Sequence, residues 1–214
     1  DLNEKLHSNE FKDDKKLHSN EFNDDEKLYY FSDNDFILLR NVYNNGSTAF
    51  YLAFHIETCH IFMIKKFIYY DSFKKYHLRE IEFCRNFKHR CLCHCYGFIK
   101  NKSTIEGIVF EYACNGNMNH FILNNEIKND FYSFQAILRI FQAIKYLHSN
   151  GFVHRDIKPS NILVDHDFIP YLSDFDTIRS TNLIEKEGEK EDFTADIGSA
   201  LYSSPEQLNG MNVS

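Results

Sequence analysis

Short apolar runs separated by polar residues dominate the chain after residue 35. Four of them are rich in β-branched and aromatic residues and predict strands at 36–39, 50–54, 61–64 and 108–110. Two later runs, 162–164 and 169–172, predict the strands of a small hairpin. The first half of the chain is therefore expected to be mostly sheet.

Two segments carry apolar residues at helical spacing. The first lies between residues 76 and 87, with Leu78, Ile81, Phe83, Cys84 and Phe87. The second is stronger, with Ile137, Leu138, Ile140, Phe141, Ile144 and Leu147. Asn150 and Gly151 then supply a good helix C-cap. We expect a helix near 76–87 and a longer one over 134–150.

A repeat opens the chain. Residues 5–11, Lys-Leu-His-Ser-Asn-Glu-Phe, recur at 16–22. An 11-residue period suits a long helix with a slight right-handed supercoil. However, each copy supplies one Leu and one Phe, which is little to bury, and the array is short. The favoured interpretation of residues 1–32 is a flexible, acidic, low-complexity arm.

Composition limits the class of protein. The chain has 214 residues, of which 43% are hydrophobic and 16% aromatic, and this excludes a wholly disordered protein. There is no apolar run of membrane-spanning length, and the charged start, Asp1 to Glu4, has no apolar signal core. We therefore expect a cytoplasmic chain without a membrane partner, whose six cysteines are reduced thiols.

The net charge of −7 is unevenly distributed. Residues 1–35 contain 11 acids and 5 lysines, a balance of −6, which leaves −1 for the rest of the chain. A nucleic-acid-binding domain needs a basic face, so this distribution argues against a nucleic-acid partner.

The polar motifs after the second helix carry the functional signal. The run His154-Arg155-Asp156-Ile157-Lys158-Pro159-Ser160-Asn161 is followed by Asp174-Phe175-Asp176 and by Ser204-Pro205-Glu206. Upstream, Lys65 ends a predicted strand, and Glu80 lies fifteen residues later on the first helix. In this order and spacing the motifs closely resemble the eukaryotic protein kinase family, in its serine/threonine or tyrosine-kinase-like group, from residue 36 to the C-terminus.

The resemblance implies a two-lobed α+β fold. Residues 33–214 would form the kinase domain. Residues 33–112 would form an N-lobe of antiparallel sheet with one helix, and residues 113–214 a partial, mostly helical C-lobe. Because the family's C-lobe continues further, we expect a fragment, a truncated gene product or a degenerate kinase, with a possible partner that completes the lobe.

The same resemblance assigns roles to individual residues. Asp156 would orient the substrate hydroxyl, and Lys65, held by Glu80, would grip the α- and β-phosphates of ATP. Asn161 and Asp174 would ligate Mg²⁺ through hard oxygen atoms. The remaining nucleotide contacts would come from Asn45, Gly46, Ser47, Glu111, Ala113 and Leu163.

Lys158 decides the expected substrate. It follows Asp156 by two residues and matches the lysine that contacts the transferring phosphate in serine/threonine kinases. The expected activity is therefore transfer of the ATP γ-phosphate to Ser/Thr hydroxyls of a protein.

Three features depart from the family pattern. The phosphate-covering loop, residues 43–49, contains one glycine, Gly46, and Asn44 or Asn45 is expected to replace another by tolerating positive φ. Asp176 replaces a glycine, and the bulky Met63 and Phe110 are expected to narrow the adenine pocket.

These departures keep two other functions open. One is a pseudokinase that acts as a non-catalytic binding or scaffold module, and the other is a nucleotide sensor without turnover. The intact set of Lys65, Glu80, Asp156, Asn161 and Asp174 favours the enzyme.

The activation segment would run over residues 174–206. Thr194 is the favoured phosphorylation site, with Arg155 able to receive its phosphate as a bidentate pair. Ser180, Thr181 and Ser199 are the competing hydroxyls.

The cysteines at 91, 93 and 95, with His94 between them, suggest a zinc site at first sight. Their alternate spacing lacks the usual turn between ligands. We therefore favour small core thiols, with Cys95 on a buried strand and Cys84 on the helix above it.

Overall fold

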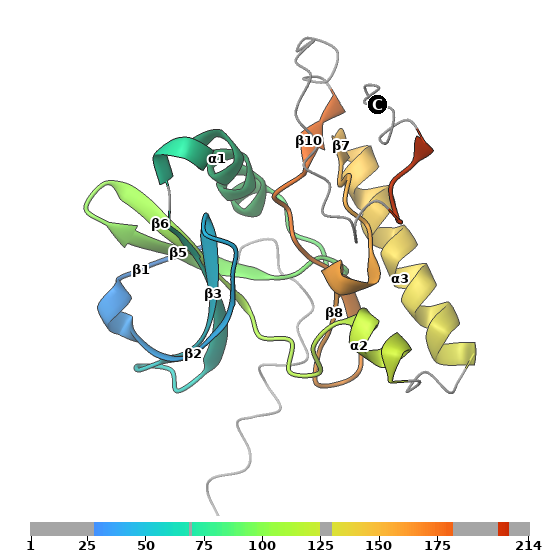
Figure 1. Ribbon diagram of the computed structural model, residues 1–214, viewed down its shortest axis with the longest axis horizontal. Coiled ribbons are helices and arrows are strands. Elements are labelled where there is room, and N and C mark those ends of the chain that lie inside the picture. The colour runs from blue at the N-terminus through green and yellow to red at the C-terminus, as the bar shows by residue number, and fades with distance from the viewer. Residues whose placement is uncertain (1–27, 69, 125–129, 182–200, 206–214) are drawn as a thin grey trace, which may run out of the picture.

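The computed structural model describes residues 28–68, 70–124, 130–181 and 201–205 (Figure 1). A twisted sheet covered by helix α1 (Tyr70–Asn86) forms one part of the molecule, and the long helix α3 (Asp130–Ser149) dominates the other. This arrangement confirms the predicted two-lobed α+β fold.

The sheet has six strands within the described residues, in the order β1-β5-β6-β4-β3-β2. All neighbouring pairs are antiparallel except β1 with β5. The strands are β1 (Tyr29–Phe31), β2 (Phe36–Asn44), β3 (Thr48–His55), β4 (Ile61–Phe67), β5 (Cys95–Asn101) and β6 (Thr104–Glu111).

Strand β1 was not expected, because it lies within the segment interpreted as an acidic arm. It pairs with β5 through Tyr29 opposite Gly97. A Cβ atom at Gly97 would lie 2.0 Å from the backbone oxygen of Tyr29, so only glycine permits this close approach. The glycine that weakens the strand pattern of β5 is therefore the residue that allows β1 to join the sheet.

The two faces of the sheet have different roles. Successive side chains on β4 point to opposite faces, so Ile64 and Lys65 diverge. Ile64 packs in an aromatic-rich cluster with Phe36 on the outer face. Lys65 faces α1, where the larger core cluster brings together residues of α1, β5, β6 and α3. A buried lysine is thus placed at the junction of the two lobes.

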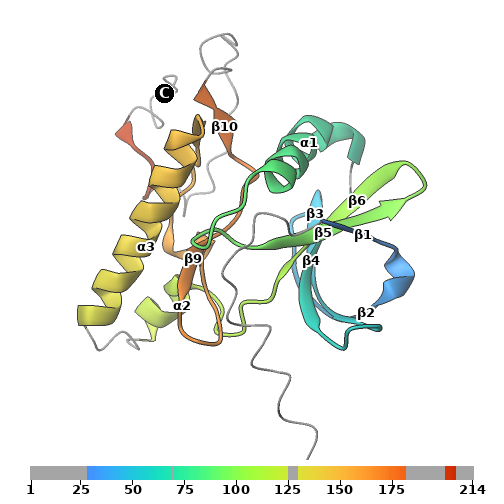
Figure 2. The ribbon, with the colours of Figure 1, turned by 180° about the vertical axis from the view of Figure 1, so that it is seen from behind.

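The second lobe is built around α3 and two small two-stranded sheets (Figure 2). Its described elements also include α2 (Met118–Leu123), β7 (Phe152–Val153), β8 (Ile162–Val164), β9 (Pro170–Leu172) and β10 (Arg179–Ser180). Strand β8 pairs with β9, and β7 pairs with β10. Gly151 ends α3 with a positive φ of 75°, which confirms the predicted C-cap.

The predicted elements are present, most of them longer than expected. The strands at 36–39, 50–54, 61–64 and 108–110 correspond to β2, β3, β4 and β6, and the hairpin to β8 and β9. The predicted helices correspond to α1 and α3. The sequence did not predict β1, α2, β7 or β10, and it indicated β5 only through Cys95.

The cysteine cluster lies in the core. Cys84, Cys91, Cys93 and Cys95 are all buried in the cluster that joins α1 to α3. The thiol of Cys91 donates to Gln142 Oε1 at 3.4 Å, and that of Cys95 to the carbonyl of Gly97 at 3.6 Å. The expected burial of Cys84 and Cys95 is confirmed.

Helix α3 buries one side and exposes the other. Ile140, Ala143 and Leu147 lie in the core. The opposite side exposes Phe134, Ile137, Leu138 and Phe141, the last of these to 64%. No helix among the described residues is long and apolar enough to cross a membrane.

Candidate active site

Lys65 stands at the centre of the site. Its Nζ lies 2.9 Å from Oε1 and 2.8 Å from Oε2 of Glu80 on α1, and both side chains are 1% exposed. The predicted pairing of these two residues is therefore present in the structure. Asp176 Oδ1 makes a further ion pair with the same ammonium group.

The charges of this cluster influence one another. Burial by itself would lower the pKa of Lys65, but the carboxylates of Asp176 and Glu80 outweigh it and raise that pKa. Burial and the nearby Asp176 carboxylate raise the pKa of Glu80. Burial would likewise raise the pKa of Asp176, yet the Lys65 ammonium outweighs it and lowers the value. In the free chain Lys65 is thus a cation shared by two acids.

Asp156 lies in the loop between β7 and β8, beside two other predicted site residues. Its Oδ2 accepts hydrogen bonds from Lys158 Nζ at 2.7 Å and from Asn161 Nδ2 at 2.9 Å. Asn161 Nδ2 also reaches the Asp156 backbone oxygen at 2.9 Å. The three residues form one network that fixes the carboxylate.

This loop is anchored to the segment that leads to Asp174. The ring of His154 is buried, and burial lowers its pKa to about 4, so the neutral ring donates from Nε2 to the carbonyl of Ser173 at 3.0 Å. Ser173 donates from its backbone N and its Oγ to the carbonyl of Asn161, at 2.8 and 2.9 Å. Thr177 Oγ1 donates to the carbonyl of His154 at 2.7 Å. Asp156 and Asp174 are therefore held in one rigid frame.

Asp174 and Asn161 offer the oxygen atoms for a metal ion. Asp174 adopts a positive φ of 64°. Burial and the Asp176 carboxylate raise the pKa of Asp174 to about 6. A cation bound there would stabilise the ionised form of Asp174. The NH₂ group of Asn161 is used by Asp156, which leaves its carboxamide oxygen as the donor for a cation. A carboxylate and a carboxamide are the hard ligands that Mg²⁺ prefers, so the residues fit this ion.

The phosphate-covering loop joins β2 to β3. Gly46 has a φ of 88°, whereas neither Asn44 nor Asn45 has a positive φ. The prediction that one of these asparagines replaces a glycine by adopting a positive φ is therefore wrong. The two asparagines act through their side chains instead. Asn45 Oδ1 accepts from the backbone N of Ser47 at 3.1 Å and of Thr48 at 2.8 Å, and Asn44 Oδ1 accepts from that of Gly46 at 2.8 Å.

The residues predicted to surround the adenine lie on β4, on β6 and just after it, and on β8. Met63 on β4 is directly opposite Phe110 on β6. Met63, Ala113 and Leu163 all pack against the large core cluster. Phe50, which sequence analysis overlooked, pairs with Lys65 across β3 and β4, and its ring centroid is 5.4 Å from Nζ. The register of the strands, rather than any motif, reveals this contact.

Glu111 follows Phe110 at the end of β6. Its Oε1 accepts from the backbone N of His94 at 2.6 Å. Burial, with a smaller contribution from Asp165, raises the pKa of Glu111 to about 7. The folded state therefore favours the neutral acid. The resulting stabilisation is full below the unfolded pKa near 4.5 and is lost as pH rises through about 7.

We expect Glu111→Gln to remove this pH dependence. Urea unfolding from pH 5 to pH 8 should show the native chain losing about 2 kcal/mol relative to the variant, after allowance for solvent screening of a half-buried group. The comparison cancels the titration of all other groups. Parallel pH profiles of the two proteins would contradict this origin of the shift.

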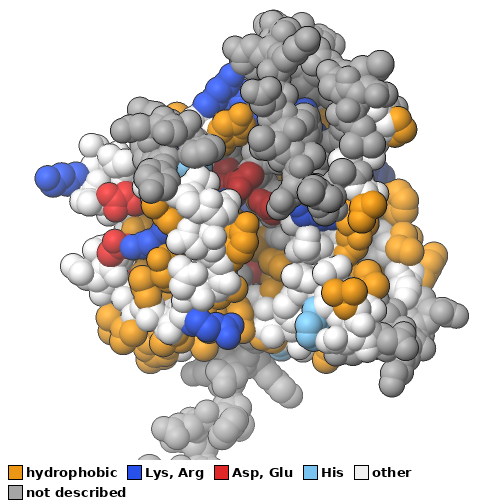
Figure 3. All heavy atoms as spheres, in the orientation of Figure 1, with side chains coloured by type: hydrophobic (Ala, Val, Ile, Leu, Met, Phe, Trp, Pro, Cys, Tyr) orange, Lys and Arg blue, Asp and Glu red, His pale blue; other side chains and the backbone are white. Residues whose placement is uncertain are grey.

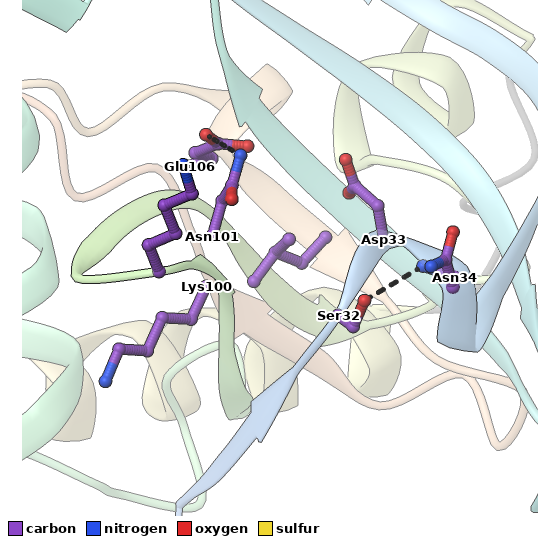
Figure 4. Close-up of a pocket in the computed structure, with 8 residues that line it drawn as sticks. Ser32, Asp33, Asn34, Lys100, Asn101 and Glu106 are labelled. Carbon is purple, nitrogen blue, oxygen red and sulfur yellow. Dashed lines mark hydrogen bonds between the residues drawn. The ribbon is translucent and has the colours of Figure 1, made fainter.

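Acidic side chains gather in the hollow between the two lobes, near the centre of the face in Figure 3. A separate hollow of about 370 Å³ lies at the far edge of the sheet, lined by Ser32, Asp33, Asn34, Ile99, Lys100, Asn101, Lys102 and Glu106 (Figure 4). It contains no predicted site residue. Its acids already have partners, since Asp33 pairs with Lys66 at 2.8 Å and Glu106 accepts from Asn101 at 2.9 Å.

Two of the four candidate phosphorylation sites, the favoured Thr194 and Ser199, lie outside the described residues. Ser180 lies on β10 and is half-buried. Thr181 Oγ1 donates to the carbonyl of Gly151 at 3.3 Å, and its backbone N donates to the same oxygen at 2.8 Å. Arg155 adopts a positive φ of 71° beside Asp156.

Comparison with known proteins agrees with this geometry. The family model for the protein kinase domain matches residues 44–214. NUAK family SNF1-like kinase 1 of Mus musculus is 33% identical over 141 residues, which are 65% of this chain and 20% of that protein. Maternal embryonic leucine zipper kinase of Danio rerio is 31% identical over 131 residues, 61% of this chain and 19% of that protein.

Mitogen-activated protein kinase 15 of Caenorhabditis elegans is 33% identical over 135 residues, 61% of this chain and 28% of that protein. The match thus spans 19% to 28% of the length of these three relatives. The matched region contains Lys65, Glu80, Asp156, Asn161 and Asp174, which the fold brings to one place between two lobes. On this joint ground of sequence and geometry, the chain belongs to the protein kinase family.

Proposed function

We propose that the chain is a serine/threonine protein kinase that transfers the γ-phosphate of ATP to protein hydroxyls. The observation that carries the proposal is the joint geometry of the two polar networks. Lys65 is held by both carboxylate oxygens of Glu80, and Asp156 is held by Lys158 and Asn161. Phosphoryl transfer depends mainly on such positioning and on charge stabilisation.

Each residue has a distinct task in this proposal. Asp156 orients the substrate hydroxyl and accepts its proton. Lys65 holds the α- and β-phosphates, and Lys158 neutralises charge on the transferred group. Asp174 and Asn161 hold Mg²⁺, which when bound neutralises the phosphate charge. Asn45, Gly46, Ser47, Glu111, Ala113 and Leu163 enclose the nucleotide.

The contact between Lys158 and Asp156 supports Ser/Thr specificity. The Lys158 ammonium lies 2.7 Å from Asp156 Oδ2, close enough for both residues to act on the same hydroxyl and phosphate. A lysine at this place in the motif resembles the serine/threonine kinases, so its contact with Asp156 favours Ser/Thr substrates.

The proposal is tested by incubating the chain with Mg²⁺ and γ-labelled ATP in the presence of basic and acidic protein substrates. Phosphoamino-acid analysis of the product should show phosphoserine or phosphothreonine. Thermal melting with and without Mg²⁺-ATP provides the parallel measure of binding. A folded chain that binds ATP but transfers no label would leave nucleotide sensing as its function.

A non-catalytic binding module is the second candidate, and one observation favours it. The groups that should contact phosphates already have partners within the chain, namely Asp176 on Lys65 and the asparagine side chains on the loop amides. A folded chain whose melting temperature does not respond to Mg²⁺-ATP would support this candidate.

The exposed side of α3 supports a protein partner for the second lobe. Phe134, Ile137 and Phe141 are each more than half exposed. Exposed apolar patches of this kind promote association. We expect the chain at micromolar concentration to associate in size-exclusion chromatography, and Phe141→Gln to shift it towards monomer with little change in melting temperature. A native chain that elutes as a monodisperse monomer would contradict the expected role of this face.

A further inference from the structure

The ammonium group of Lys65 has no hydrogen left for a phosphate. A lysine ammonium carries three N–H donors and no acceptor. Two point to the two carboxylate oxygens of Glu80, and Asp176 Oδ1 takes the third. The lysine side chain is 1% exposed, so water does not reach it.

Asp176 differs from Glu80 in how it is held. Glu80 is on α1 and is 1% exposed, whereas the Asp176 side chain is 37% exposed. Asp176 also comes from a different part of the fold, 111 residues after the lysine. The Asp176 side chain is thus partly open to solvent, from which a nucleotide would arrive. Of the two carboxylates, Asp176 is therefore the one that can be displaced.

Other groups around Lys65 are also already in contact with atoms of the chain. The Phe50 ring lies 5.4 Å from Nζ on the strand next to Lys65. On the neighbouring loop, the amides of Gly46, Ser47 and Thr48 donate to asparagine oxygens. Oxygen atoms of the chain thus satisfy both the lysine and the loop amides before any phosphate is present.

We propose that Asp176 occupies the position of a nucleotide phosphate on Lys65 and competes with ATP for that lysine. The inference rests on the proposed function, because it takes Lys65 to be the phosphate-binding cation. Asp176 is an internal inhibitor: its carboxylate must leave Nζ before a phosphate oxygen can take the same N–H. The Lys65–Glu80 pair remains intact throughout this exchange.

The chain offers variants that isolate the competition. Asp176→Asn removes the charge with almost no change in shape, and Asp176→Gly removes the side chain. Asp176 is not among the residues with positive φ, so its backbone accommodates either change. Asp167→Asn is the matched control for charge, since Asp167 is an exposed aspartate that pairs with His166 at 3.1 Å away from the site.

The experiment measures ATP affinity by titration calorimetry with Mg²⁺ present. It compares the native chain with the three variants, and it compares Lys65→Met with the double variant Lys65→Met/Asp176→Asn. A charge-assisted hydrogen bond released by Asp176→Asn corresponds to ATP binding about tenfold tighter, and Asp176→Gly should behave alike. Asp167→Asn should bind as the native chain does. In the Lys65→Met background, Asp176→Asn should give no tightening, because no shared lysine remains.

The outcomes separate the inference from the proposed function. ATP binding by the native chain without tightening in Asp176→Asn or Asp176→Gly overturns the inference and leaves the proposed function intact. Equal tightening with and without Lys65 also overturns it, because the effect would then be general charge repulsion. If no folded variant binds ATP, both the inference and the proposed function fail.

Discussion

Asp156→Asn is expected to lower phosphate transfer by at least about 100-fold, the usual loss for a missing general base. The variant retains the shape of the side chain and can still contact Lys158 and Asn161, which lie 2.7 and 2.9 Å from Oδ2. It loses the negative charge that orients and deprotonates the hydroxyl. Initial rates at saturating Mg²⁺-ATP measure the loss.

Nucleotide binding separates this role from a structural one. Because Asp156 is assigned to the substrate hydroxyl, the dissociation constant for ATP should change by less than about threefold, or well under 1 kcal/mol. Asp167→Asn, which removes an exposed carboxylate from the nearby hairpin, should retain full activity. A comparable turnover of Asp156→Asn and the native chain would rule out the assignment.

Lys65→Met is expected to lower transfer by about 100- to 1,000-fold, the range for removing one preorganised charge. It should also destabilise the fold, since Glu80 and Asp176 would then face each other without their shared cation. Breaking a buried ion pair by removing one partner costs about 3–5 kcal/mol. Kinase assays and urea unfolding measure the two effects.

Two further variants sharpen this prediction. Glu80→Gln should be less damaging than Lys65→Met, because Asp176 still pairs with the lysine and the amide oxygen can still accept one hydrogen bond. Lys66→Met is the matched control, since the adjacent lysine pairs with Asp33 near the protein surface at 2.8 Å. It should be close to the native chain in both assays. A larger loss in Glu80→Gln than in Lys65→Met would show that the pairing is misassigned.

The parts of the fold that the sequence predicts are those with a strong local pattern. Helix α3 repeats apolar residues over several turns, and β3, β4 and β6 are apolar runs at the centre of the sheet. Strand β5 contains Gly97, which interrupts its pattern, and β1 has three residues next to a charged arm. Their pairing depends on a close backbone approach at Gly97, which cannot be predicted from local strand propensity.

The site shows the same distinction between motif and tertiary contact. The family resemblance predicted that Lys65 pairs with Glu80, and the distances agree. The hydrogen bond from Asn161 to Asp156 was not predicted. The contact between Asp176 and Lys65 joins residues 111 positions apart. From the sequence, Asp176 appeared only as a replacement for a flexible glycine. The contact between Phe50 and Lys65 likewise depends on the register of β3 and β4, which the sequence alone does not predict.

Chemical labelling with an acyl phosphate of ATP would show whether Lys65 is the phosphate-binding cation of a nucleotide site between the lobes. Such a probe delivers its acyl group to an amine beside the bound phosphates, and peptide mass spectrometry identifies the labelled lysine. We expect labelling of Lys65 and, among the other described lysines, of Lys158, suppressed by excess ATP and faster in Asp176→Asn. If labelling is confined to exposed lysines such as Lys100 and Lys102 and excess ATP does not affect it, the assignment of Lys65 is contradicted.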